Sequence, residues 1–433
     1  MARTVFRGGI HPPDRKDIVK SFPIERAPLP ARLIVPMSQH LGAPCVPTVA
    51  VGDRVERGQL IGDVDAFISA PVHAPASGTV AEIRSVLLGS GVRSSAVIID
   101  PDPEQDYDRF VELPIELKTA DTVKAAGIVG MGGAAFPSKV KLSPPPDVTI
   151  DTVILNGCEC EPYLACDHRM MVEHPGLVMS GAQLIRDAIG AKRVVIAIED
   201  NKPEAIEMLK AEADDAVEIE AVPTRYPQGA EKQLIYSILG REVPHGKLPA
   251  HAGALVHNVG TAAAIAEAVS RRKPLIERVV TVTGAVKNPG NFLTLIGTPV
   301  SALLEAAGGF EGEPGRVIMG GPMTGMALAD LNVPVVKGTS GIVVLRPDET
   351  APAVQDDQPC IRCGRCARVC PMALLPYQIG IYANINDLDG ADRFHAMDCI
   401  ECGCCSYICP TRRPLVQLIR RSKHGLMERG KRQ

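Results

Sequence analysis

Hydrophobic and polar positions alternate with different periods along the chain, and the first regular stretch covers residues 29–100. Short apolar runs there alternate with polar positions and are broken by glycine turns, most clearly in 51–61 and 71–80. Alternation at a period of two with frequent turns is typical of short paired strands. We therefore expect a small all-β module in this part of the chain.

The middle of the chain changes to a pattern in which helical and strand periods take turns. Strands are expected at 152–155, 193–198 and 217–222, and helices at 119–126, 176–189 and 203–213. Gly190 is placed to end the second of these helices, because glycine accepts the left-handed conformation at a helix C-terminus. Strands that alternate with helices in this way form a parallel sheet covered by helices.

A third pattern begins near residue 278. Strand-like residues at 279–286 are followed by a Pro289-Gly290 turn, and a helical pattern covers 300–307. These elements predict a small α+β module. The length of 433 residues corresponds to about three domains at roughly 150 residues each, so the fold class is multidomain α/β. The expected boundaries are 1–110, 111–275, 276–345 and 346–433.

Composition excludes some classes of function. The net charge is −4, tryptophan is absent and aromatic residues make up only 3% of the chain, so we expect no nucleic-acid partner. No window approaches roughly 18 uninterrupted apolar residues, and the N-terminus lacks the apolar core of a signal peptide. We expect a chain that stays in the cytoplasm and does not span a membrane.

The strongest chemical signal is a doubled cysteine motif in the last hundred residues. Both copies have the spacing C-x2-C-x2-C-x3-C-P, and the second follows 39 residues after the first. Bacterial ferredoxin-type sequences hold 4Fe-4S clusters with this spacing, and the fourth cysteine of each run ligates the other cluster. We therefore predict one cluster on Cys360, Cys363, Cys366 and Cys409, and a second on Cys399, Cys402, Cys405 and Cys370.

Structural zinc and disulfides are weaker explanations of this motif. Zinc ligands usually come in two pairs, and nothing in the sequence marks an oxidising compartment. Cys404, next to Cys405, is expected to be a buried thiol rather than a ligand. Because two clusters carry electrons one at a time, the rest of the chain should contain an electron donor, an acceptor or a docking surface.

A glycine-rich segment at 127–142 is a second candidate site. Its run Gly130-x-Gly132-Gly133 lets backbone N–H groups approach a phosphate closely. It lacks the dinucleotide fingerprint, because it follows a predicted helix rather than a strand. The next strand delivers residues 156–162 at its C-terminal end, where open α/β sheets bind ligands. Loops at 225–231 and 256–261 are expected at the same edge.

The N-terminal β module is similar to biotinyl and lipoyl carrier domains, which present a modified lysine on a hairpin. No lysine lies between Gly62 and Gly78, so we reject a swinging cofactor arm. We interpret the module as structural, or as a docking face.

Several motifs resemble the flavoprotein subunit of respiratory complex I, which binds NADH and FMN. They are Gly130-x-Gly132-Gly133-Ala-x-Phe136-Pro137 with Lys141, Asn156-x-x-Glu159-x-Glu161-Pro162, Gly229-x-Glu231 and Asn258-Val259-x-Thr261. Together with the Gly8-Gly-Ile-His-Pro-Pro13 opening, the carrier-like module and the doubled cysteine motif, they make the whole chain resemble the RnfC family of the Rnf electron transport complex. Cys158 and Cys160 depart from the complex I pattern, because they replace an aspartate and a serine.

The resemblance implies four modules: a barrel-sandwich module, a Rossmann-like FMN and NADH domain, a β-grasp ligand-binding module, and an α-helical ferredoxin-type domain. It implies that Gly130, Gly132 and Gly133 hold a cofactor phosphate, that Phe136 packs near the nicotinamide and flavin rings, and that Lys141 meets a phosphate or ribose. Asn156, Glu159, Glu161 and Asn258 would bond the flavin or nucleotide, and Glu231 the ribose hydroxyls. We assign no catalytic side chain, because hydride transfer between the cofactors needs no acid or base from the protein.

Other roles stay open for some of these residues. Lys141 is equally well explained as a solvated surface cation, and Cys158, Cys160 and Cys166 as small buried thiols. A third metal site built from those three cysteines is a weaker hypothesis, because no ligand rule covers their spacing. His168 is expected to be a hydrogen-bonded structural histidine.

The resemblance implies a peripheral component of a membrane-bound, ion-translocating complex, on the cytoplasmic face of the bacterial inner membrane. It would exchange electrons between NADH and ferredoxin through FMN and two 4Fe-4S clusters, with integral membrane and ferredoxin-like subunits as partners. Two alternatives are a soluble cobalamin reductase with similar modules, and a non-catalytic electron relay or scaffold. The tail at 412–433 has eight Lys or Arg residues and one acidic residue, which is typical either of a solvated helix end or of a segment attracted to lipid headgroups.

Overall fold

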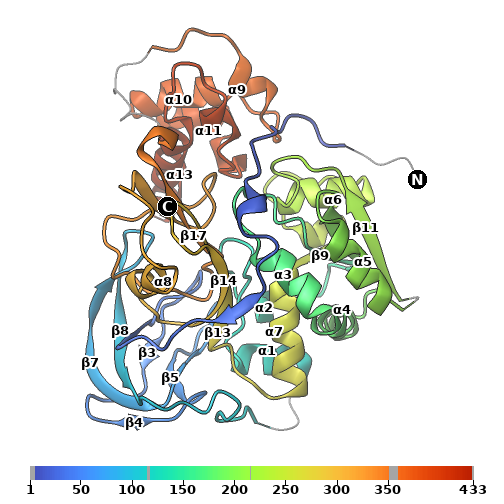
Figure 1. The fold of residues 1–433 in the computed structure, drawn as a ribbon. Helices are drawn as coiled ribbons and strands as arrows, with labels where there is room; N and C mark the ends of the chain where they lie inside the picture. Colours follow the sequence, from blue (N-terminus) through green and yellow to red (C-terminus); the bar gives the residue numbers. More distant parts are fainter. Residues whose placement is uncertain (1–4, 115–117, 215, 351–358, 432–433) are drawn as a thin grey trace.

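The computed structural model describes residues 5–114, 118–214, 216–350 and 359–431, which form four modules (Figure 1). The carrier-like β module lies at the bottom of the view, and the α/β domain lies on the right. The β-grasp module lies on the left between these and a helical cluster domain at the top. The N-terminal segment runs along the junction between the α/β domain and the other modules.

The carrier-like module consists of two small antiparallel sheets, as its alternating pattern predicts. One sheet has the order β2-β8-β7-β4, with β2 at Leu33–Pro36, β8 at Arg93–Pro101, β7 at Gly78–Leu87 and β4 at Arg54–Val55. The other has the order β3-β5-β6, with β3 at Val46–Pro47, β5 at Leu60–Asp63 and β6 at Val72–His73. Their inward side chains share one core that includes Leu33, Val55, Ile61 and Val97.

The α/β domain has a four-stranded parallel sheet in the order β11-β10-β9-β12. The strands are β9 (Thr152–Asn156), β10 (Arg193–Glu199), β11 (Val217–Val222) and β12 (Ala254–Asn258). The helices are α1 (Thr119–Ala125), α2 (Ser138–Lys141), α3 (Cys166–Glu173), α4 (Pro175–Ile189), α5 (Pro203–Glu212), α6 (Glu231–Leu239), the 3-10 turn η2 (Pro249–Ala252) and α7 (Val259–Ser270). The elements predicted from the sequence are confirmed to within one or two residues, and Gly190 ends α4 in the left-handed conformation.

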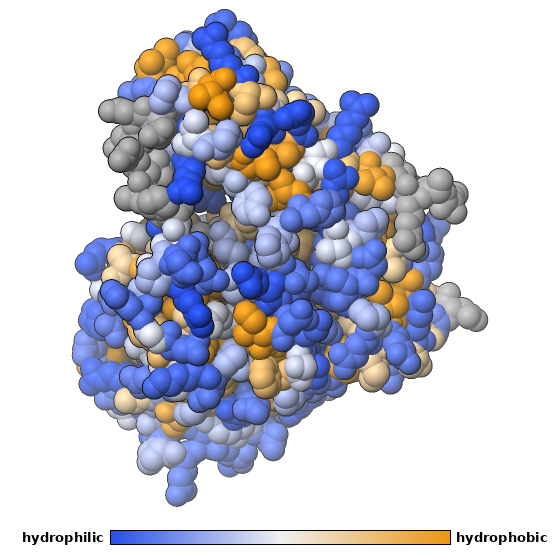
Figure 2. All heavy atoms as spheres, turned by 45° about the horizontal axis from the view of Figure 1, so that its top comes forward, coloured by the Kyte–Doolittle hydropathy of each residue, from blue (hydrophilic) through white to orange (hydrophobic). Residues whose placement is uncertain are grey.

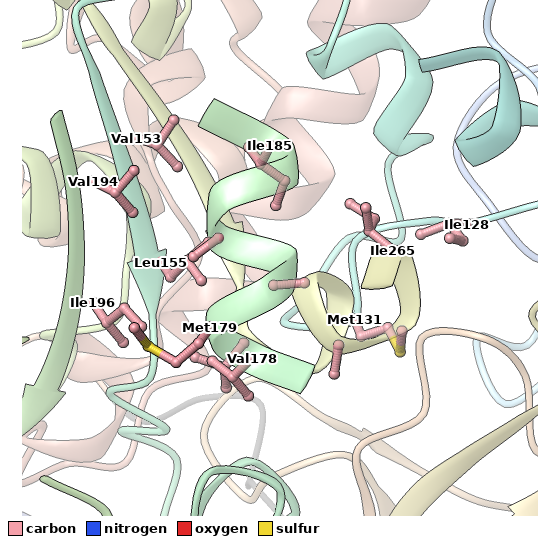
Figure 3. Packing of buried hydrophobic residues seen from close by; sticks show 14 of the residues in the cluster. Ile128, Met131, Val153, Leu155, Val178, Met179, Ile185, Val194, Ile196 and Ile265 are labelled. Carbon is pink, nitrogen blue, oxygen red and sulfur yellow. The ribbon is translucent and has the colours of Figure 1, made fainter. Parts of the chain in front are cut away.

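Helix α4 covers one face of this sheet and aligns the strand ends that carry the candidate site. Figure 3 shows Val178, Met179 and Ile185 of α4 packed toward side chains of β9 and β10, such as Leu155 and Ile196. Complete burial of each such side chain stabilises the fold by ~1.5–3 kcal/mol. The opposite side of α4 contacts α7 at Gly181, where a Cβ would collide with the Ala262 carbonyl. The close approach of the two helices therefore depends on glycine.

The β-grasp module has a mixed sheet in the order β1-β14-β13-β17-β15-β16. Its elements are β13 (Glu277–Gly284), β14 (Gly290–Leu295), α8 (Val300–Ala306), β15 (Arg316–Met319), β16 (Met326–Ala327), β17 (Gly341–Leu345) and η3 (Pro347–Glu349). Its edge strand β1 (Ile24–Arg26) follows η1 (Lys16–Ile18) and pairs in parallel with β14, although the expected boundaries put these residues in the N-terminal module. Asn291 anchors the N-terminal segment there by donating to the carbonyls of Val19 and Phe22.

The cluster domain is built from short helices around a small core of Ile379, Ala391 and Ile419. Its elements are α9 (Arg365–Arg368), α10 (Pro376–Asn384), α11 (Leu388–Arg393), η4 (Ala396–Asp398), α12 (Cys404–Tyr407) and α13 (Leu415–Lys431). In the described part of the chain, no helix combines the length and the apolar character that crossing a membrane requires.

Candidate functional site

Two cavities in the cluster domain collect the eight motif cysteines in the predicted crossed sets. The first cavity has an empty volume of about 350 Å³, and its cysteines are Cys360, Cys363, Cys366 and Cys409. The second has an empty volume of about 340 Å³, and its motif cysteines are Cys370, Cys399, Cys402 and Cys405. Each cavity therefore takes three thiols from one copy of the motif and the fourth from the other copy.

The two loops that line these cavities share one backbone shape. Arg362 and Gly364 adopt positive φ in the first copy, and Glu401 and Gly403 do so in the second. Each pair is separated by the same 39 residues that separate the motifs. Left-handed residues turn the backbone sharply enough for three cysteines on a short loop to face one point.

Backbone N–H groups are directed at the sulfurs of the second cavity. The N–H of Leu374 donates to Cys370 Sγ at 3.4 Å, and the N–H of Glu401 donates to Cys399 Sγ at 3.4 Å. Burial raises the pKa of the Cys399 thiol to about 11, so a bound cation is needed to hold its thiolate at neutral pH. Hydrogen bonds to sulfur also adjust cluster reduction potentials.

The two cavities are adjacent. Cys366 from the first and Cys405 from the second pack in one hydrophobic cluster with Leu415 and Val416 at the start of α13. Van der Waals contact between ligands of two clusters gives a short, water-free path for single electrons.

The glycine-rich segment lies at the carboxyl end of the parallel sheet. Gly132 is next to Asn258 at the end of β12, where a Cβ on Gly132 would lie 3.1 Å from the Asn258 Cβ. The N–H of Met131 donates to Thr261 Oγ1 at 2.9 Å, which attaches the loop to the first turn of α7. Gly133 is exposed and has open space where a Cβ would be. The loop closes on itself where the Gly130 N–H donates to the Phe136 carbonyl, and the Phe136 side chain is half-buried.

Lys141 and Glu231 meet beside the same strand end. Lys141 Nζ donates to Glu231 Oε1 at 2.8 Å and to the Val256 carbonyl of β12 at 3.0 Å. Both side chains keep about a third of their surface exposed. Lys141 is therefore not a fully solvated cation, because α2 and α6 hold it against the sheet.

Asn156 and Glu159 belong to the loop that leaves β9. Asn156 Nδ2 donates to the Gly229 carbonyl at 2.8 Å, and its Oδ1 accepts from the Cys158 N–H at 3.1 Å. The Glu159 carboxylate accepts from the N–H groups of Asp167 and His168 at the start of α3. These hydrogen bonds give both side chains a fixed direction at the sheet edge.

Asp167 is a residue of this site that the sequence motifs do not mark. Its Oδ2 accepts a 2.6 Å hydrogen bond from Asn258 Nδ2. Burial and the nearby charge of Glu159 raise the pKa of Asp167 to about 7. The available signal was its position between Cys166 and His168, in a segment where only those neighbours were considered.

Glu161 is directed away from the glycine loop and toward the β-grasp module. Its carboxylate accepts from the Met323 N–H at 3.0 Å and from the Thr324 hydroxyl. Burial raises the pKa of Glu161. Lys16 donates to the Glu161 carbonyl at 2.9 Å, so this segment joins three modules. Contact of Glu161 with a nucleotide stays a prediction.

The cysteines at 158, 160 and 166 do not gather into one group. Cys158 Sγ lies 3.7 Å from the Ala197 carbonyl, whereas Cys166 groups with Glu159 and Asp167. Among the described residues, neither potential metal-binding group contains Cys158 or Cys160. The hypothesis of a third metal site from these three cysteines therefore has no geometric support.

Cys160 instead lies where the α/β domain meets the cluster domain. It packs in a hydrophobic cluster with Ile10, Tyr226 and Cys404, and Cys402 packs against the same cluster. Tyr226 donates its hydroxyl hydrogen to the Cys402 carbonyl at 2.7 Å. Cys404 is fully buried, as expected, and also lines the second cavity. A continuous packed contact thus connects the loop after β9 with the second cavity.

A larger cavity of about 1150 Å³ lies between α7 and the β-grasp sheet. Met131, Asp167 and Gly260 form part of its wall, so it is next to the polar groups at the strand ends.

Four domain families match the chain in this order. They are described as the RnfC barrel sandwich hybrid domain (residues 4–104), the Nuo51 FMN-binding domain (123–267), the SLBB domain (279–327) and the 4Fe-4S dicluster domain (352–410). The chain is also 44% identical to the RnfC-type subunit of the proton-translocating ferredoxin:NAD(+) oxidoreductase complex of Clostridium ljungdahlii, with 96% of this chain and 92% of that protein covered. The chain belongs to the RnfC family.

Two further RnfC relatives match over nearly the whole chain. The corresponding subunit of the Na(+)-translocating ferredoxin:NAD(+) oxidoreductase complex of Acetobacterium woodii is 45% identical, with 98% of this chain and 97% of that protein covered. Its counterpart in the ion-translocating oxidoreductase complex of Rhodobacter capsulatus is 43% identical, with 98% and 83% covered. A crystal structure of an NAD+-reducing [NiFe]-hydrogenase shares the fold at a TM-score of 0.51 and 22% identity, over 71% of this chain and 62% of that one.

The residues of this RnfC chain fit the groups that these domain families bind. Each cysteine cavity offers four thiols, which is the donor set of a 4Fe-4S cluster. At the flavin domain, the N-terminus of α7, Lys141 and the open space at Gly133 suit a phosphate. The side chains of Asn156 and Asn258 lie beside it at the strand ends, as hydrogen-bonding groups suited to a flavin.

Proposed function

We propose that this chain exchanges electrons between NADH and ferredoxin within an ion-translocating membrane complex, using FMN in the α/β domain and two 4Fe-4S clusters in the cluster domain. The packed contact from Cys160 through Tyr226 to Cys402 is the observation that carries the proposal. When bound, FMN supplies the conversion between two-electron hydride chemistry and one-electron cluster chemistry. The chain's own part is to hold these groups close together and dry.

In the flavin domain, the glycine loop and the N-terminus of α7 would hold the FMN phosphate. The positive end of the α7 dipole and the Lys141 ammonium both favour an anion there. Asn156 and Asn258 would bond the flavin ring, Phe136 would pack against the rings, and Glu231 would accept from ribose hydroxyls. The hydrogen bond from Asn258 to Asp167 keeps that amide oriented before any ligand binds.

Two features support an order of the cavities along the route. The second cavity touches the flavin domain through Tyr226, Cys402 and Cys404. The first has an exposed cysteine, Cys363, next to Ile361, which is 59% exposed. We therefore assign the second cavity to exchange with the flavin, and the first to exchange with a partner.

The cluster domain offers an apolar surface to such a partner. Figure 2 shows hydrophobic residues on the forward-turned top of the molecule, within a largely hydrophilic surface. Exposed apolar residues of the cluster domain are Ile361, Leu375, Ile385, Met397, Tyr407 and Met427. We propose that a ferredoxin-like subunit docks on this domain, and that integral membrane subunits hold the assembly at the cytoplasmic face of the membrane.

Anaerobic titration with NADH tests the proposal. The purified chain, supplied with FMN and carrying its clusters, is expected to lose flavin absorbance and then to show reduced-cluster EPR signals. Dithionite serves as the control, because it reduces clusters without nucleotide. Clusters that respond to dithionite but not to NADH would identify the chain as an electron relay.

A further inference from the structure

A group of metal-binding side chains lies outside both cysteine cavities and the flavin site. His245, His395 and Asp398 each offer one ligand atom, and these atoms all lie within 4.8 Å of one another. His245 Nδ1 is 2.7 Å from Asp398 Oδ2, and the two imidazole rings meet edge to face with centroids 5.7 Å apart. Both histidines are exposed, so an ion can reach them from solvent.

The three ligands come from two domains. His245 lies in the loop between α6 and η2 of the flavin domain, whereas His395 and Asp398 flank and form part of η4 in the cluster domain. His395 adopts a left-handed φ of 57°, which is uncommon for a residue with a side chain. That conformation precedes η4 and places the imidazole beside His245.

The chemistry of this donor set favours a transition-metal ion over calcium or magnesium. Imidazole nitrogen suits zinc, copper and nickel, whereas calcium and magnesium take oxygen ligands. Two histidines and one carboxylate leave a fourth tetrahedral position for water. Ligand atoms held ~2.0–2.2 Å from a tetrahedral ion lie about 3.4 Å apart, so small rotations of exposed side chains are enough to close the site.

We propose that His245, His395 and Asp398 form a binding site for a divalent transition-metal ion of the zinc class, which fastens the flavin domain to the cluster domain. The site is one residue from Cys399, a motif cysteine of the second cavity. Other side-chain links between the described parts of these domains include the bond from the Tyr226 hydroxyl to Cys402 and a longer one, at 3.3 Å, from Gln233 to the Pro371 carbonyl. A metal bridge would add a strong link at the position where the spacing of flavin and cluster is set.

The test uses the full chain with both clusters and FMN in place, titrated anaerobically with ZnCl2 in a calorimeter. We expect one zinc ion per chain in the wild type, and an affinity at least about tenfold weaker in His245→Ala and His395→Ala. His251→Ala is the matched control, because His251 is an exposed histidine of the same domain outside the group. It should bind zinc like the wild type.

Two further measurements separate this site from the cysteines. The iron content is determined before and after the titration, and zinc X-ray absorption reports the ligand atoms. Unchanged iron with only nitrogen and oxygen around zinc supports the proposal. Sulfur ligands, loss of iron, absence of zinc binding, or equal binding by wild type and both histidine variants would each overturn it. Because His245 is on an exposed loop, His245→Ala should fold and keep its clusters, which the iron content also checks.

Discussion

Asn156 and Asn258 are direct register partners on the adjacent parallel strands β9 and β12, and each is the last residue of its strand. Neither amide is free to rotate. Asn156 is held by Gly229 and Cys158, and Asn258 by Asp167 and by the Thr261 N–H, whose bond caps α7. Two fixed amides at neighbouring strand ends, with a glycine loop against one of them, form the frame of the flavin site.

The first prediction concerns the glycine that touches this frame. A side chain on Gly132 has its first carbon 3.1 Å from the Asn258 Cβ, so Gly132→Val should push into the frame and block FMN binding. The cysteine cavities lie in another domain and should still assemble. We expect the flavin content to fall at least about tenfold while the iron content stays near eight per chain, as two cubanes require.

Gly176→Ala is the control for that variant. A Cβ at Gly176 would lie 3.9 Å from Glu212 Oε2, which is an ordinary contact, and the residue is in the first turn of α4. This variant should keep both flavin and iron. Full FMN binding by Gly132→Val would remove the glycine loop from the flavin site.

The second prediction tests the crossed cysteine sets. Cys370 is four residues from Cys366 in sequence, yet it lies in the cavity of Cys402. The double variant Cys370→Ala with Cys402→Ala should damage one cluster and keep about four iron atoms. Cys370→Ala with Cys363→Ala should damage both clusters and keep almost none. Iron analysis with EPR of the reduced protein measures this, and the reverse pattern would show that each motif fills its own cluster.

The third prediction concerns a buried ion cluster that joins the modules. Glu277 of β13 pairs with Lys273 at 2.8 Å, with Arg57 of the carrier-like module at 2.7 Å and with Arg26 of β1 at 3.2 Å. Burial opposes ionisation of Glu277, but these cations outweigh it and lower its pKa to about 2. Relative to its ordinary value of 4.5, this shift corresponds to about 3 kcal/mol of stability.

For a carboxyl with a lowered pKa, that stability is present above the unfolded value and is lost as the pH falls toward the folded value of about 2. Glu277→Gln should therefore lower the free energy of unfolding by about 3 kcal/mol equally at pH 7 and pH 5.5. Glu82→Gln is the control, because Glu82 pairs with Arg32 at the exposed surface and should cost at most about 1 kcal/mol. Urea unfolding measures both, and equal costs would refute a structural role for the buried cluster.

Local patterns in the sequence account for most of the elements but not for contacts between modules. The periods that predict β9, β10, β11 and α4 depend on neighbouring residues, so their limits agree with the structure. The cysteine sets were also predictable, because cluster ligation imposes a spacing rule. The strand β1 was not, since three residues carry no period and its partner β14 is far along the chain.

The side chains at the candidate site show the same division. Asn258 and Gly132 were found through motifs, and they are adjacent in the structure. Glu161 was assigned to the nucleotide, but in the structure its carboxylate bonds Met323 and Thr324 of a module that follows much later in sequence. Asp167 and the pair His245 and Asp398 were missed for the same reason, because their partners come from distant segments.

The last prediction concerns attachment to the membrane, and it depends on the basic residues of α13. Arg420 pairs with Glu401 at 2.7 Å, and Lys423 donates to the Cys399 carbonyl at 2.8 Å. Arg429 pairs with Asp389, and Arg421 donates to the Ala383 carbonyl. Free basic residues near anionic lipid gain roughly 1 kcal/mol each. These four already bind within the cluster domain, so we expect lipid attraction to contribute little.

Contacts with integral subunits should therefore hold the chain at the membrane. We expect a salt and carbonate wash to release it without detergent, and deletion of the genes for its integral partners to leave it in the soluble fraction. The purified chain should also fail to sediment with anionic vesicles at physiological salt, where screening weakens the remaining charges. Retention after both treatments would contradict peripheral attachment through proteins. A chain that stays soluble even when its partners are present would instead favour a free cobalamin reductase or relay, because neither needs a membrane partner to place its clusters.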